Sequence, residues 1–128
     1  MRYTKHFLLV LWALCELIRY DAVRALGGSA YIRRGSPRPS ASGPTNDDVA
    51  RTTCRALSLA ACLYWKPVLC LQRSVCTVRL LRKRGVVARL VIGYRPVPYF
   101  FHAWVEVNGQ IVNDSTTYQD RLQVLYSY

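Results

Sequence analysis

The sequence predicts an α+β fold, with helices in the first two thirds of the chain and a small antiparallel sheet after them. Apolar residues recur at helical spacing as far as residue 84, and Gly27-Gly28, Lys66-Pro67 and Gly85 interrupt the pattern. From Val87 onwards, short stretches rich in β-branched and aromatic residues are typical of strands. Helices followed by strands, without regular alternation of the two, favour helices packed on an antiparallel sheet. The expected helices cover residues 6–26, 49–65 and 70–84, and the expected strands cover residues 87–93, 100–107, 110–114 and 122–128.

Length and composition fit one domain. The chain has 128 residues, of which 52% are hydrophobic, enough to bury one core but too few for two domains. We therefore expect a single domain over residues 1–128, made of an N-terminal helix (1–26), a loop or linker rich in Gly, Pro and Ser (27–45) and a core (46–128). Asn46-Asp47-Asp48 supplies a cap and an acidic first turn for the second helix.

The N-terminal segment has a basic start and a short apolar run, as a secretory signal does. However, Glu16, Arg19 and Asp21 follow while the apolar spacing continues, which a cleaved signal would not require. The uninterrupted apolar run is far shorter than the roughly 20 residues that span a membrane. A packed amphipathic helix is favoured, and docking on a membrane surface or on a partner protein is the alternative. The residues expected to make the contact are Leu11, Leu14, Ile18 and Leu26.

The five cysteines are an odd number, contain no Cys-x-x-Cys pair and lie in apolar helical surroundings. A disulfide framework is therefore not expected, and a reducing compartment such as the cytoplasm fits the composition. The gaps between the cysteines match no usual zinc-ligand spacing, so a zinc site is not expected either.

A formal net charge of +11 is typical of proteins that bind an anionic partner. The arginines are spread over several elements, and the cluster Arg82-Lys83-Arg84 lies where a helix should end, where cations complement the helix dipole. Such a distribution suits an acidic peptide or protein better than the phosphate backbone of a nucleic acid. We therefore expect no nucleic-acid partner.

Cys70, His102 and Asp114 occur in the order that a thiol enzyme requires, with a nucleophile, a base and a carboxylate that orients the base. Cys70 is expected at the start of a helix, where unpaired amides and the helix dipole stabilise a thiolate and can donate to an oxyanion. The alternative is that His102 is a half-buried strand residue between aromatic side chains, and that Asp114 is a solvated carboxylate at a strand end. The cysteines expected to be inert inside helices are Cys54, Cys62 and Cys76.

The hairpin between the second and third strands decides whether Asp114 shares a face with His102. A two-residue loop pairs Val107 with Gln110 and turns Asp114 away from the histidine. A three-residue loop, with a left-handed glycine in a bulge, places His102 directly opposite Asp114. The catalytic interpretation requires the three-residue loop. In the other register Asn113 is the first substitute for the carboxylate.

A wider pattern surrounds these residues. It consists of Cys70-Leu71-Gln72-Arg73-Ser74, residues 80–93, His102-Ala103-Trp104-Val105-Glu106-Val107-Asn108-Gly109 and Val112-Asn113-Asp114. This pattern resembles the transglutaminase-like leader peptidases of lasso peptide biosynthesis, in their stand-alone protease form. The resemblance is strong over residues 65–115. Over the residues before position 65 it is general and concerns only length and helix content. It implies a transglutaminase-like or papain-like cysteine protease core.

The resemblance also implies a function. Cys70 would be the nucleophile, His102 its base and Asp114 the orienting carboxylate, in a reaction that removes the leader from a ribosomally made precursor. A partner cyclase would then close an isopeptide ring on the freed core, and a separate protein would recognise the leader, because no leader-recognition domain is visible in this chain. No metal or organic cofactor is implied. The second oxyanion donor is left open, with Trp65 and Gln72 as candidates.

Two other function classes remain as alternatives. A transglutaminase-like acyl transferase would use an amine in place of water as the acceptor. A non-catalytic basic module would bind a peptide or a nucleic acid, and its cysteines would show no selective reactivity.

Overall fold

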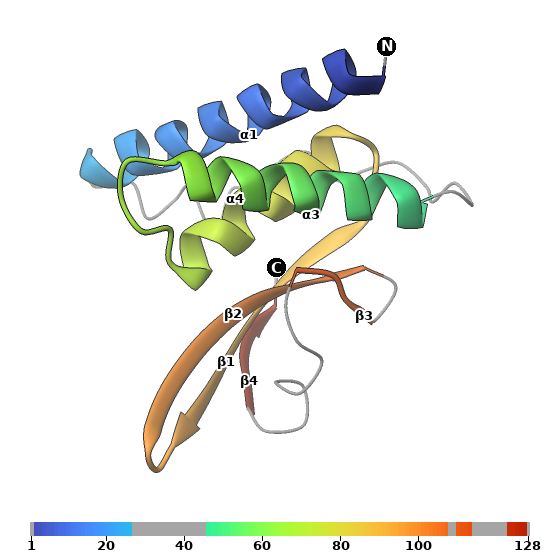
Figure 1. Ribbon diagram of the computed structural model, residues 1–128. Helices are drawn as coiled ribbons and strands as arrows, with labels where there is room; N and C mark the ends of the chain where they lie inside the picture. Colours follow the sequence, from blue (N-terminus) through green and yellow to red (C-terminus); the bar gives the residue numbers. More distant parts are fainter. Residues whose placement is uncertain (1, 27–45, 108–109, 114–122, 128) are drawn as a thin grey trace.

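The computed structural model describes residues 2–26, 46–107, 110–113 and 123–127 (Figure 1). Helices lie on one side and a small antiparallel sheet on the other, so the predicted α+β class is confirmed. The predicted loop over residues 27–45 lies outside the described residues. The described elements are α1 (Arg2–Ala25), α3 (Asn46–Leu63), α4 (Cys70–Lys83), β1 (Ala88–Pro96), β2 (Tyr99–Val107), β3 (Gln110–Ile111) and β4 (Gln123–Ser127).

The strand order in the sheet is β3-β2-β1-β4, with every neighbouring pair antiparallel. β1 and β2 pair along their whole length, from Ala88 opposite Val107 to Pro96 opposite Tyr99. The predicted C-terminal strand is confirmed as β4, whereas β3 is shorter than the predicted 110–114.

The core lies between the sheet and α4, the helix that contacts β1, β2 and both other helices. Alternate residues of β1 and β2 face it, as a period of two requires. Leu90 and Ile92 of β1 and Val105 of β2 belong to the same buried cluster as the helices. Trp104 is also buried, but with Val91 and Ile111 in a second cluster on the opposite face of the sheet.

Helix α1 packs on α3 and α4, as the amphipathic interpretation predicted, but through a different face. Of the four predicted contact residues, Leu14 packs against the core, whereas Leu11, Ile18 and Leu26 are 41%, 55% and 88% exposed, so the prediction is wrong for these three as contacts within the chain. The helix carries apolar side chains on several sides, and spacing alone therefore does not identify the buried stripe. The buried apolar residues of α1 are Leu9, Val10, Ala13, Leu17 and Tyr20.

Buried polar contacts explain the choice of face. Glu16 is 2% exposed and forms ion pairs with Arg79 and Lys83 of α4. One turn further along α1, Asp21 accepts from Lys66 across 2.6 Å and from the hydroxyl of Tyr64. A carboxylate is buried only where cations compensate its charge, so these pairs hold α1 in one orientation. Among the described helices, none has an apolar stretch of the length that a bilayer requires.

Candidate active site

Cys70 is the first residue of α4, as predicted. The preceding residue, Leu69, has an extended backbone (φ −78°, ψ 165°) and its side chain makes no capping hydrogen bond. The first helical hydrogen bond runs from Arg73 N to Leu69 O at 3.0 Å, so the amides of residues 70–72 have no acceptor within the helix. These amides and the positive end of the helix dipole lie next to a half-buried thiol. The arrangement suits a thiolate and an oxyanion.

The other four cysteines have different surroundings. Burial raises the pKa of the Cys54 thiol to about 11, and burial together with the Glu16 carboxylate raises that of Cys76 further. Both thiols stay protonated at neutral pH, which fits the prediction that they are inert. Cys15 and Cys62 are exposed on α1 and α3, away from any helix start.

His102 lies in the middle of β2, opposite Gly93 of β1. Its ring stacks between Phe100 and Trp104, with centroid separations of 6.0 and 6.3 Å and interplanar angles of 20° and 26°. Two aromatic neighbours limit rotation of the imidazole, and the glycine opposite contributes no side chain that could crowd it. The three rings share the face of the sheet that alternates with Ala103.

The start of α4 lies at the edge of β2. Ser74, one turn after Cys70, donates to Ala103 O at 3.0 Å. This carbonyl points along the sheet towards the β3 side, because Val105, two residues on, bonds Val112 and Asn113, which follow β3 on that side. The structure thus brings the helix turn after Cys70 beside the strand segment that carries His102. The imidazole, however, lies on the face of Trp104, whereas Cys70 packs against the opposite face, with Ala103 and Val105. Both side chains are described, and no hydrogen bond joins the Cys70 thiol to the His102 imidazole.

The β2–β3 hairpin has the register of a two-residue loop, with Val107 opposite Gln110 and Glu106 opposite Ile111. The predicted three-residue loop is therefore wrong. An Asn-Gly pair between two strands is the strongest signal for a two-residue turn, and that local preference decided the register. Residues 108 and 109 themselves lie outside the described part of the chain.

The regular pairing then ends at Asn113. Val112 N still donates to Val105 O at 3.0 Å, but Val105 N donates to the Asn113 side-chain oxygen at 2.8 Å in place of a backbone carbonyl. The Asn113 amide nitrogen in turn donates to Ser74 Oγ at 3.1 Å. Because the ladder stops here, the hairpin register no longer determines the face of the next residue, Asp114, which lies outside the described residues.

Sequence reasoning missed the role of Asn113 and Ser74 in joining β2 to α4. The sequence predicts Asn113 as a substitute for the catalytic carboxylate, but its amide bonds Val105 and Ser74, so the structure gives that role no support. The only signal in the sequence was that Ser74 lies one turn after Cys70 and that Asn113 directly precedes Asp114.

The two candidates for the second oxyanion donor differ in their surroundings. Gln72 is buried and its side-chain amide donates to Leu17 O of α1 at 3.3 Å, so this side chain contributes to the packing of α1. Trp65 is 79% exposed and its ring lies 5.6 Å from Lys66 Nζ. Within the described ranges, His, Cys, Asp and Glu side chains do not form a group of three that could hold a metal ion.

Comparison with known proteins agrees with this fold. The model of the transglutaminase-like superfamily matches residues 14–127. The microcin J25-processing protein McjB of Escherichia coli is 45% identical over 56 residues, which cover 44% of this chain and 27% of McjB. The match thus spans about a quarter of that relative's length.

No solved structure matches significantly. The two matches confirm the resemblance stated from the sequence, to transglutaminase-like proteins of peptide processing. Since the matched residues 14–127 make up far more than half of the chain, it belongs to the transglutaminase-like superfamily.

Proposed function

We propose that this chain is a cysteine peptidase that removes the leader peptide from a ribosomally synthesised lasso peptide precursor. Membership of the superfamily and similarity to a microcin-processing protein support the reaction class and the type of substrate. The observation that carries the proposal is the placement of Cys70 at an uncapped helix start, with the next turn of that helix bonded to the strand segment of His102.

In the proposed reaction the Cys70 thiolate attacks the carbonyl carbon of the peptide bond between leader and core. The free amides at the start of α4 donate to the oxyanion, and the imidazolium of His102 gives its proton to the leaving amine. The core departs with a free amino group, and the leader remains on sulfur as a thioester. His102 then takes a proton from water, the hydroxide hydrolyses the thioester, and the thiolate is restored. Asp114 is proposed to orient the imidazole and to stabilise its charged form.

The thiol and the imidazole must approach for this chemistry. In enzymes of this kind the catalytic hydrogen bonds are often long without substrate and tighten when it binds. Because the His102 ring and the Cys70 thiol lie on opposite faces of β2, we propose that substrate binding at the edge of this strand brings the two side chains together. Residues 1–128 would act as a single catalytic domain, since α1 shares its core and buries ion pairs against α4.

A separate leader-recognition protein and a lasso cyclase are the proposed partners. The first would present the precursor, and the second would use the amino group that cleavage frees.

The test is to incubate the purified chain with a lasso precursor and its leader-recognition protein and to weigh the products. Hydrolysis gives two peptides whose masses sum to that of the precursor plus water, whereas acyl transfer to an amine leaves an adduct. Cys70→Ala should abolish cleavage, and Cys15→Ala, which removes an exposed thiol of α1 outside the cavities, should not. Cleavage by Cys70→Ala at the wild-type rate would refute the proposal.

A further inference from the structure

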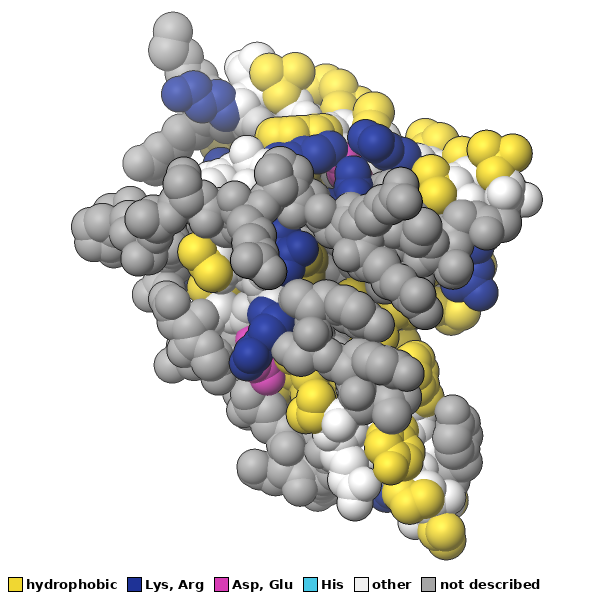
Figure 2. Space-filling model, turned by 180° about the vertical axis from the view of Figure 1, so that it is seen from behind, with side chains coloured by type: hydrophobic (Ala, Val, Ile, Leu, Met, Phe, Trp, Pro, Cys, Tyr) yellow, Lys and Arg dark blue, Asp and Glu magenta, His cyan; other side chains and the backbone are white. Residues whose placement is uncertain are grey.

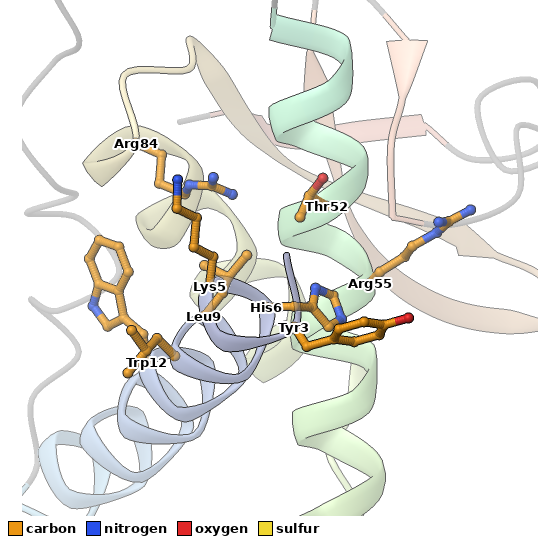
Figure 3. Close-up of a pocket in the computed structure, with 9 residues that line it drawn as sticks. Tyr3, Lys5, His6, Leu9, Trp12, Thr52, Arg55 and Arg84 are labelled. Atoms are coloured by element: carbon orange, nitrogen blue, oxygen red, sulfur yellow. The ribbon is translucent and has the colours of Figure 1, made fainter. Parts of the chain in front are cut away.

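Two neighbouring cavities line the helical side of the molecule. The larger, of about 810 Å³, lies between the start of α1 and α3 and reaches Arg84 (Figure 3). The smaller, of about 560 Å³, continues along α3 to Arg73 of α4 and Asn113. They share His6 and Arg55, so they form one path, which we call the basic groove. Its far end comes within one helical turn of Cys70, because Arg73 lies three residues after it.

The cations give the groove its character. They are Lys5, Arg51, Arg55, Arg73 and Arg84, and among the described residues that line the groove none is acidic. Figure 2 shows the same imbalance over one face of the molecule, where Lys and Arg side chains stand in several groups and acidic side chains show only small areas. The ion pairs of the described carboxylates Glu16, Asp21 and Glu106 involve other cations, namely Arg79, Lys83, Lys66 and Arg89.

Two of the arginines are held in place without losing their charge. Arg73 donates to Ser58 Oγ at 2.9 Å, and Arg84 donates to Thr53 Oγ1 at 2.7 Å. A neutral hydroxyl takes one of the five guanidinium donors and leaves the positive charge uncompensated. The remaining donors can bind a carboxylate in the two-pronged geometry that arginine favours. Ordering these side chains in advance lowers the entropy lost on binding.

The walls between the cations are apolar. Leu8, Leu9 and Trp12 line the larger cavity, and Leu59 and Cys62 line the smaller one. Alternating apolar and cationic contacts suit a peptide with acidic and apolar side chains, whereas a nucleic-acid site would need cations along a continuous phosphate track. We propose that the basic groove binds an acidic segment of the precursor peptide, a proposal that rests on the peptidase function above.

The experiment measures binding without cleavage, in full-length Cys70→Ala protein. The probe is a short fluorescent peptide of alternating Glu and Leu residues, compared with its Gln and Leu counterpart and with a single-stranded DNA of similar length. We expect the acidic peptide to bind at least about tenfold more tightly than the neutral one, in anisotropy titrations at low salt, and to weaken as salt rises. Arg55→Glu, at the junction of the cavities, should weaken the acidic peptide about tenfold or more.

The matched control is Arg24→Glu, which makes the same change of charge at an exposed position in the last turn of α1. It should change the affinity less than about twofold, apart from the long-range effect that salt screens. Equal affinity for the acidic and neutral peptides, equal effects of the two variants, or tighter binding of the DNA than of the acidic peptide would each overturn the groove proposal. The precursor-cleavage assay separates the two proposals. Cleavage without acidic-peptide binding rejects the groove alone, and acidic-peptide binding without any cleavage rejects the peptidase assignment.

Discussion

The amide nitrogen of Asn113 lies 3.1 Å from Ser74 Oγ. This hydrogen bond links the end of the β2–β3 hairpin to the second turn of α4. Since Ser74 follows Cys70 by one turn and Asn113 directly precedes Asp114, the bond joins the chain segments that carry the proposed nucleophile and its proposed orienting carboxylate. A single pair of polar side chains therefore couples the packing of helix on sheet to the geometry of the candidate site.

Asn113→Ala should lower the free energy of unfolding by about 1–3 kcal/mol, because the amide of Val105, a fully buried residue, loses its acceptor and Ser74 loses a donor. Urea unfolding measures the change. Gln123→Ala, at an exposed position of β4, is the control and should change stability by less than about 0.5 kcal/mol. Similar losses in both variants would mean that the Asn113 contacts contribute nothing specific.

Local signals sufficed for most of the fold. Helix α4 begins at Cys70, after the break at Lys66-Pro67, and ends at Lys83. Gly85, just past the C-cap, has a φ of +82°, which glycine adopts without strain. The switch from helical spacing to a period of two located β1 and β2 within three residues at each end. These features depend on neighbours in the sequence, and for that reason one sequence predicts them.

The features that the sequence did not predict depend on distant residues. The face of α1 that packs is determined by Glu16, whose partners Arg79 and Lys83 are more than sixty positions away. The early end of β3 is determined by Asn113, whose side chain replaces a backbone acceptor and reaches Ser74, 39 positions earlier. Spacing within one element contains no information about either contact. The register of the hairpin is different, since Asn108-Gly109 signalled it and the catalytic interpretation was wrongly preferred over that local rule.

The cysteines should react selectively with an alkylating reagent at neutral pH. Cys70 should react first, because it is partly accessible at a helix start, whereas Cys54 and Cys76 should resist because burial raises their pKa. Peptide mapping by mass spectrometry after timed alkylation measures the order, with exposed Cys62 as the comparator. Faster labelling of Cys62 than of Cys70 would show that the helix start does not activate the thiol.

Cys70→Ala and Cys76→Ala should have opposite effects. Cys70→Ala should abolish cleavage and leave the fold intact, since the side chain is only partly buried. Cys76→Ala should cost about 1–2 kcal/mol of stability, because it creates a cavity at a fully buried position, yet keep its activity per folded molecule. Urea unfolding and the precursor assay, run on the same samples, separate the two effects. Equal loss of activity in both would reject Cys70 as the nucleophile.

His102→Ala should reduce cleavage more than Asp114→Asn. An amide at position 114 could still accept a hydrogen bond from the imidazole, although it could not stabilise the imidazolium, whereas alanine at position 102 removes the base itself. The rate of product formation at saturating precursor measures the ranking, and circular dichroism checks that both variants are folded. An inactive Asp114→Asn beside an active His102→Ala would reverse the proposed roles.

Glu16→Gln should destabilise the protein by about 3 kcal/mol. The substitution removes the carboxylate that forms an ion pair with the guanidinium of Arg79, 8% exposed, in the interface between α1 and α4. Urea unfolding at neutral pH measures the loss. Asp48→Asn removes one negative charge from an exposed position of α3, and this control should cost less than about 1 kcal/mol. If both variants lose the same amount, general charge balance explains the effect better than the buried ion pair.

The contribution of Glu16 should disappear in acid. Burial alone would raise the pKa of this carboxyl, but the hydrogen bonds from Lys83 and Arg79 outweigh burial and hold the pKa below its ordinary value of 4.5. Because the folded pKa is the lower one, the stabilisation is fully present above about pH 4.5 and is lost as the pH falls through the folded value. The difference in unfolding free energy between wild type and Glu16→Gln, measured in urea from neutral pH downwards, should therefore be constant to about pH 5 and shrink below it. A difference that stayed constant into strong acid, where the carboxyl is protonated and resembles the amide, would show that the ion pairs with α4 do not account for the stability that Glu16 provides.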